Sequence, residues 1–195
     1  PQDRPPGRIW RRPGVDAGCW AGVTAGAWRG LLSSYVPVAL ESARQSASTI
    51  GALVAVANAA SLVGAAASGR VRGRWSRRVL LTGIVAAGLA TALTGAVAGH
   101  VALSATVLAL SGVAAGALQV LGPAIAAESV HEEERGDAIA VSGTFRAAAL
   151  FVAPLAVAGL VVVVPLAPAV AVVGAAMTIP AVALRRRTGV IKEAV

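Results

Sequence analysis

Two arginines stand alone in long stretches of the sequence that are otherwise uncharged. Arg29 is the only charged residue of 17–40, and Arg146 is the only charged residue of 138–184. If these stretches cross a membrane, each guanidinium costs at least ~2.5–3.5 kcal/mol at the bilayer centre, and such residues mark functional sites by default. Facing a water-filled cavity, either arginine could bind an anionic ligand or pair with a carboxylate.

Each arginine also has an interpretation without function. Arg146 lies about two turns from the start of its stretch, so its side chain could reach the headgroup region. Arg29 lies nearer the middle of its stretch and reaches the headgroups less easily. For Arg29 the alternative is that the span begins later and Trp28-Arg29 marks the membrane interface.

Two uncharged polar residues are further candidates to line a cavity. Asn58 and Gln119 each lie within an apolar run. Such residues more often form hydrogen bonds between helices than ligand contacts. Asp16 and Glu41 flank the first stretch, where they could titrate if buried, although stabilisation of helix ends is the commoner role of such residues.

The sequence contains no pattern typical of an active site. Cys19 is the single cysteine, and His100 and His131 lie far apart. Neither a disulfide nor a metal cluster follows from these residues. No nucleophile–base pair and no phosphate-binding loop is present. The sequence therefore predicts neither an enzyme nor a bound metal or cofactor.

The composition is typical of an integral membrane protein. Hydrophobic residues make up 56% of the 195 residues and charged residues only 13%, against about 25% charged in soluble domains. The net charge of +8 lies in short clusters, and aromatic residues are only 4% of the chain. This distribution lacks the basic face and the stacking aromatic side chains of a nucleic-acid-binding protein.

The uncharged runs predict six membrane-spanning helices. Each run provides the ~20 apolar residues that a span needs, without the strict alternation of a β-barrel. The last run is too long for one helix, and Pro165-Leu166-Ala167-Pro168 divides it. The predicted spans are 17–40, 46–68, 79–98, 101–127, 138–163 and 167–184.

The first predicted span carries a ridge of small residues. Gly18, Gly22, Gly26, Gly30 and Ser34 follow one another at intervals of four. This spacing places them on one face of a helix, where they allow another backbone to approach closely. The ridge predicts a tight seam between helices, or alternatively the sliding surface of a moving helix.

The basic residues predict the orientation. With six spans, fourteen of the seventeen basic residues fall on one side, and Arg44 falls on the other. The positive-inside rule then places both termini in the cytoplasm, with the chain in the inner (plasma) membrane. We expect a basic linker over 1–16, a transmembrane domain over 17–184 and a basic tail over 185–195.

The connection after the second span carries a recognisable motif. It reads Gly69-Arg70-Val71-Arg72-Gly73-Arg74-Trp75-Ser76-Arg77-Arg78. This segment resembles the signature loop of the major facilitator superfamily, in which a glycine precedes Asp-Arg, an aromatic residue and Gly-Arg-Arg. Gly73 stands where the family has Asp, and Ser76 where it has the second Gly. The residues that fit are Gly69, Arg74, Trp75, Arg77 and Arg78.

A second stretch strengthens this resemblance. Glu128, the acidic turn 132–134, and then Arg135-Gly136-Asp137 are similar to the end of the fourth helix of a facilitator half. Glu128, Arg135 and Asp137 are therefore candidate gating charges. The acidic residues could pair with Arg77 and Arg78 across the loops, or all of these charges could be solvated. The segment 153–159 resembles a degraded form of an exporter motif on the fifth helix.

The resemblance implies an all-α fold of six helices, arranged as a 3+3 inverted repeat that forms one half of a twelve-helix transporter. It implies a lipid bilayer, an N-terminal six-helix half and a small organic solute as partners. Transport would be proton-coupled, with export one possible direction. The alternative is a six-helix domain of another class, such as an ABC permease domain or a non-transporting subunit. The upstream reading frame would distinguish them.

Overall fold

The computed structural model describes residues 9–71 and 74–192, except for the side chains of 74 and 186–192. Arg4 and Arg8 of the predicted basic linker, and Arg72 and Gly73 of the signature motif, lie outside this part. The described chain is all-α, as predicted. Its helices are α1 (Pro13–Ser42), α2 (Ala47–Ser68), α3 (Arg74–Val97), α4 (Val101–Glu128), α5 (Arg135–Val161), α6 (Leu166–Ala176) and α7 (Ile179–Lys192), with short 3-10 turns at Ile9–Arg11 and Glu132–Glu134.

The described chain runs along the bundle six times, but only five of these passes are apolar enough to be identified as membrane spans from hydropathy. These five are α2, α3, α4, α5 and the pair α6–α7, which counts as one span over Leu166–Arg185. The sixth is α1, in which 16 of 30 residues are buried inside the bundle, against four of 22 in α2. Because neighbouring helices cover most of α1, it needs little hydrophobic surface, and it contains glycine, hydroxyl and charged residues instead.

The observed helices begin and end at other residues than the predicted spans at three places. The first residues of α3, from Arg74 onward, are helical although they precede the predicted span 79–98. The break between α5 and α6 lies at 162–165 and ends at Pro165, the first residue of the predicted breaking segment, whereas Pro168 lies within α6. A second break, at Met177-Thr178, was not expected; it precedes Pro180, which lacks the N–H needed to continue the helical ladder. After it, α7 runs on into 185–192.

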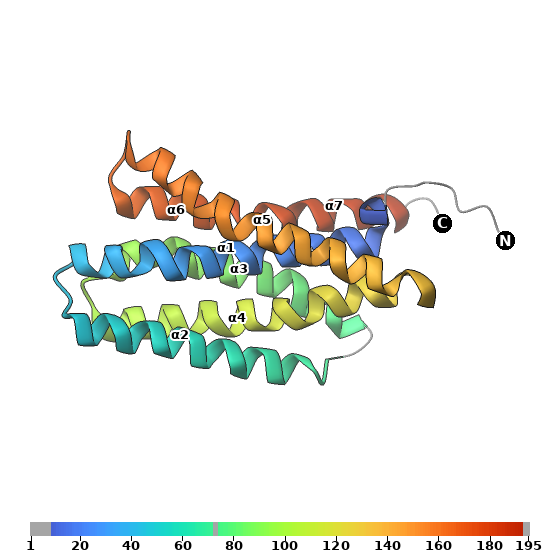
Figure 1. The fold of residues 1–195 in the computed structure, drawn as a ribbon, viewed down its shortest axis with the longest axis horizontal. Helices are drawn as coiled ribbons and strands as arrows, with labels where there is room; N and C mark the ends of the chain where they lie inside the picture. The colour runs from blue at the N-terminus through green and yellow to red at the C-terminus, as the bar shows by residue number, and fades with distance from the viewer. Residues whose placement is uncertain (1–8, 72–73, 193–195) are drawn as a thin grey trace.

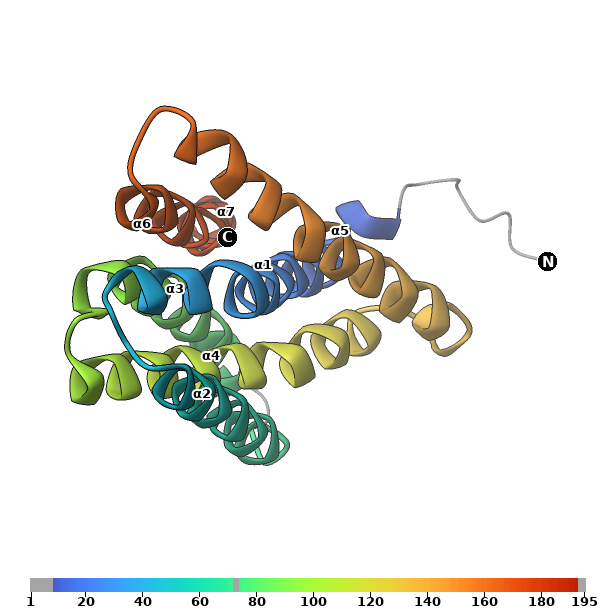
Figure 2. The same ribbon diagram turned by 60° about the vertical axis from the view of Figure 1, so that its left-hand side comes forward.

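The helices lie side by side, and α1 begins at the same end of the bundle at which α7 ends (Figure 1). The α2–α3 and α4–α5 connections lie at this end, while the α1–α2, α3–α4 and α5–α6 connections lie at the opposite end. Packing follows the order α5, α1, α4, α2, with α3 against α4 and α6. In Figure 1 α3 runs behind α1, and Figure 2 shows α6 and α7 on the side of the bundle away from α2. The described parts of the basic segments therefore lie at one end.

The glycine ridge of α1 forms a tight seam, as its spacing predicted. A Cβ added at Gly22, Gly26 or Gly30 would lie under 3.0 Å from a backbone carbonyl oxygen of α5. Gly18 meets Gly122 of α4 in the same way. No side chain larger than hydrogen fits there without moving a helix.

A second seam of the same kind joins α4 to α2. Gly112 and Gly116, again four residues apart, lie against the backbone carbonyls of Ala57 and Ser61. The packing of α1 on α5 is thus repeated by α4 on α2, as expected for a 3+3 inverted repeat. Between α1 and α4, Trp28 Nε1 donates a buried 3.0 Å hydrogen bond to Ser111 Oγ.

Candidate functional site

One side of α1 is left open by its neighbours. Between residues 14 and 37 only Arg29 and Ser33 are exposed, and they are one helical turn apart. Gly26 and Gly30, which flank Arg29 in sequence, face α5, whereas Trp28 faces α4. Arg29 therefore lies in the opening between α4 and α5.

Arg29 reaches across the bundle to the second helix. Its guanidinium Nη1 donates a hydrogen bond to Oδ1 of Asn58 on α2. Asn58 is fixed in turn, because its Nδ2 donates to the Val54 carbonyl at 2.9 Å. Since α4 packs between α1 and α2, this link spans the width of α4.

A second link mirrors the first. Arg146 of α5 donates from Nη2 to Oε1 of Gln119 on α4 at 2.9 Å. Gln119 follows Gly116 by three residues, just as Arg29 follows Gly26. The two residues therefore occupy equivalent positions in the two halves of the repeat, each on the open side of its helix.

We call Arg29, Asn58, Gln119 and Arg146 the polar face. The four residues come from α1, α4, α2 and α5. The sequence predicted these four as cavity candidates, and the structure brings them together as two arginine–amide pairs. Whether they line a transport path stays a prediction.

The polar face carries positive charge that no carboxylate neutralises within the part of the chain that the structure describes. The sequence has no Asp or Glu between Glu41 and Glu128, nor between Asp137 and Glu193. Within the described residues both arginines have only neutral amide partners. The amides orient the two guanidinium groups without cancelling their charge.

Four of the five signature residues, Arg74, Trp75, Arg77 and Arg78, are part of α3 rather than of a loop. Gly69 directly follows α2, and Arg74 opens α3 with its side chain outside the described part. Arg77 Nη2 lies 3.4 Å from the carbonyl oxygen of Leu184 in α7. The guanidinium of Arg78 lies over the Trp75 ring, 5.2 Å from its centroid. The first contact joins the first turn of α3 to α7, and the second lies within the first turn of α3 itself.

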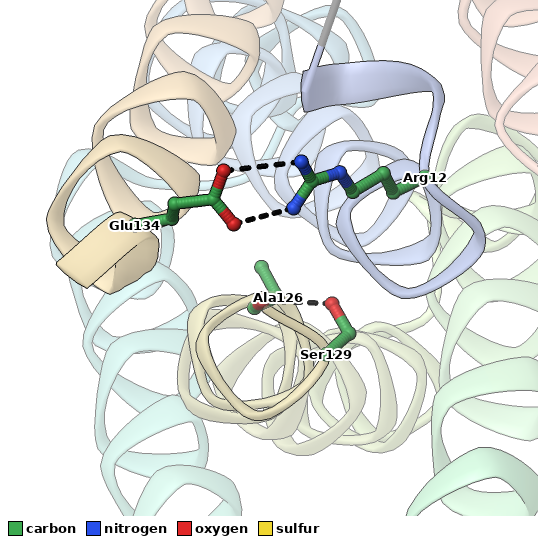
Figure 3. A network of polar contacts seen from close by, with 4 residues as sticks. All are labelled: Arg12, Ala126, Ser129 and Glu134. Atoms are coloured by element: carbon green, nitrogen blue, oxygen red, sulfur yellow. Dashed lines mark hydrogen bonds and ion pairs between the residues drawn. The ribbon is translucent and has the colours of Figure 1, made fainter. Parts of the chain in front are cut away.

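An ion pair that the sequence did not predict closes the same end of the bundle. Arg12, just before α1, makes two hydrogen bonds to the Glu134 carboxylate, at 2.5 and 3.0 Å (Figure 3). These bonds and the nearby negative charge raise the pKa of Arg12. Figure 3 also shows Ser129 donating to the Ala126 carbonyl at the end of α4. The pair links the entry to α1 with the α4–α5 connection.

The three predicted gating charges lie around this pair. Glu128, Arg135 and Asp137 are all exposed. Arg135 approaches Glu132 at 3.8 Å, a distance typical of a weak surface pair. In the described ranges, no group of three or more His, Cys, Asp or Glu gathers as a metal site would require.

Comparison with known proteins gives a family match over most of the chain. The family model described as Major Facilitator Superfamily matches residues 18–193. Among solved structures, the inward-open xylose transporter XylE from E. coli aligns with a TM-score of 0.68 at 18% sequence identity. The alignment covers 88% of this chain and 45% of XylE. No curated protein matches the chain.

Proposed function

Because this chain belongs to the Major Facilitator Superfamily, we propose that it is one six-helix half of a secondary active transporter for a small organic solute. The chain spans about half the length of the transporter whose fold it shares. A second six-helix half would complete the molecule. Family membership supports the prediction that the chain is not an enzyme, and it disfavours an ABC permease domain.

The polar face is the wall that would meet the second half. This assignment rests on one observation, that α1 exposes only Arg29 and Ser33 along its middle. Two of the helices that carry the polar face, α2 and α5, are the least buried of the five apolar spans, at 17% each. Against lipid, two arginines would each cost several kcal/mol. Against a water-filled path between two rocking halves, they are solvated.

Cysteine labelling in native membranes tests this wall. In a Cys19→Ser background, Ser33→Cys should react with a membrane-impermeant maleimide in at least one conformation of the protein. Val63→Cys is the matched control: it follows Asn58 by five residues, about 140° around α2, and it is 63% exposed. We expect this control to stay unlabelled in lipid. If Val63→Cys reacts and Ser33→Cys does not, the wall has been assigned to the wrong side, and a non-transporting subunit becomes the better account.

The orientation that we propose has both termini in the cytoplasm and the chain in the plasma membrane. The gathering of basic segments at one end supports it. Arg44→Cys, at the opposite end, should be labelled from outside intact cells. Trp75→Cys, which is exposed at the basic end, should be labelled only after permeabilisation. The reverse pattern would contradict this topology.

Proton coupling is part of the proposal, with the carboxylate assigned to the second half. A proton-coupled transporter needs a group that titrates within the membrane, and the six spans predicted from the sequence contain no Asp or Glu. Export stays the proposed direction on the exporter-like segment alone, whose Pro154 ring packs 3.0 Å from the position of a Gly30 Cβ. Solute flux in proteoliposomes under an imposed pH gradient would test both coupling and direction.

A further inference from the structure

The polar face presents two guanidinium groups that are held in place but not neutralised. Arg29 donates one N–H to Asn58, and Arg146 donates one to Gln119. A guanidinium has five N–H donors in a planar fork, so most of the donors of each remain available. Both partners are amides that leave the full charge in place. Such an arrangement matches a ligand with paired anionic oxygens.

We propose that the substrate is an organic anion, whose carboxylate or phosphate group binds Arg29 with Arg146 as the second cation. This inference rests on the proposed function and names the substrate class of the same site. A neutral sugar or an organic cation would leave two positive charges uncompensated when the path closes around it. An anion removes that cost as it binds.

A lipid headgroup does not explain the arrangement. Arg29 lies 16 residues from the start of α1 and 13 from its end. At 1.5 Å per residue, Arg29 is about 20 Å or more from either end of α1. In a bilayer with a ~30 Å hydrocarbon core, its side chain therefore does not reach the headgroup layer on either side. Its guanidinium also turns sideways to α2 rather than along the helix. The remaining competitor is a carboxylate supplied by the second half.

The electrostatic field of the polar face can be measured without knowing the substrate. The reporter is Ser33→Cys in a Cys19→Ser background, in membranes that contain the protein as its gene encodes it. Two thiol reagents of similar size are compared, the negatively charged sulfonatoethyl and the positively charged trimethylammoniumethyl methanethiosulfonate. Changes in thiol ionisation affect both rates equally, so the ratio of the two rates reports the field.

We expect the anionic reagent to react on the order of tenfold faster than the cationic one. Arg29→Gln should lower this ratio about three- to tenfold, since each unit charge acts with opposite sign on the two reagents. Arg29→Lys, which keeps the charge, should preserve the ratio. Arg146→Gln should lower it less than Arg29→Gln.

The outcomes separate this inference from the proposed function. If neither reagent reaches Ser33→Cys while the protein is folded, the polar face is not water-lined, and both proposals fail. If both reagents react but without anion preference, a carboxylate of the second half neutralises Arg29, and the anionic substrate is wrong while the transport path stands. A preference that survives Arg29→Gln would equally overturn the assignment to Arg29.

Discussion

Two adjacent sides of α1 differ in composition: one is lined by glycine and tightly packed, and the other is polar and exposed. On one side, Gly22, Gly26 and Gly30 bring the backbone of α5 into direct contact. On the other side, Arg29 and Ser33 are the only exposed residues between positions 14 and 37 of this helix. One turn of helix therefore carries both the closest packing of the seam and an unneutralised charge.

This difference separates what fixes the fold from what is available for function. The seam has no free volume, so adding one carbon atom to a glycine there must move a helix. The polar face has charge but little packing, so a change there alters chemistry and leaves the bundle intact. The four substitutions below test that separation, in order of their expected effect on stability.

Gly26→Ala should have the largest effect. The added Cβ would collide with the Arg146 backbone carbonyl, and overpacking of this kind costs about 1–3 kcal/mol. The thermal midpoint of the purified protein in detergent should fall, with loss of monodisperse material. Gly51→Ala is the control, because a Cβ there meets nothing within 4 Å. If the thermal midpoints of the two variants are equal, close packing at the seam does not stabilise the bundle.

Gln119→Ala should have a small effect. It deletes the acceptor of the Arg146 hydrogen bond, and hydrogen bonds between membrane helices are worth about 0.6 kcal/mol on average. Chemical denaturation in detergent would measure the loss. A decrease as large as that of Gly26→Ala would mean that the arginine–amide pair is structural.

Arg12→Gln should lower stability slightly, and the loss should shrink as salt is raised. The pair with Glu134 is geometrically good but partly exposed, with side-chain exposures of 39% and 15%, and exposed pairs are screened. A double-mutant cycle with Glu134→Gln isolates the coupling. A coupling that does not respond to ionic strength would contradict this explanation.

Arg29→Met should leave the thermal midpoint unchanged or raise it. Removing a charge from a functional face relieves a cost to the folded state, and water can solvate the freed Asn58 oxygen. The control is Arg44→Gln, at a connection outside the bundle. If Arg29→Met destabilises the protein, the charge holds the bundle together, and the division between seam and face is wrong.

The sequence predicted the helices better than their contacts. Regular spacing revealed the α1 seam, because four-residue intervals align on any helix. Six crossings followed from uncharged runs, although hydropathy alone misses α1. The break at Met177-Thr178 was missed because a single proline, Pro180, stops a helix only in some contexts.

The side-chain pairs between helices could not be predicted from the sequence. Asn58 and Gln119 were candidates, but their partners depend on α4 lying between α1 and α2, and α1 between α5 and α4. The expected pairing of Arg77 and Arg78 with the acidic turn gave no hint of Arg12 with Glu134. Such contacts depend on which helix ends meet in space, which local sequence does not encode.

The position of Arg29 relative to lipid tests the central claim most directly. An electron cryo-microscopy structure of the protein as its gene encodes it, in a lipid nanodisc, would show this position. We predict that Arg29 faces a solvent-filled space between this six-helix unit and a second one, with Asn58 still its neighbour. Arg29 pointing into the lipid belt, with no second helical unit opposite it, would contradict the account.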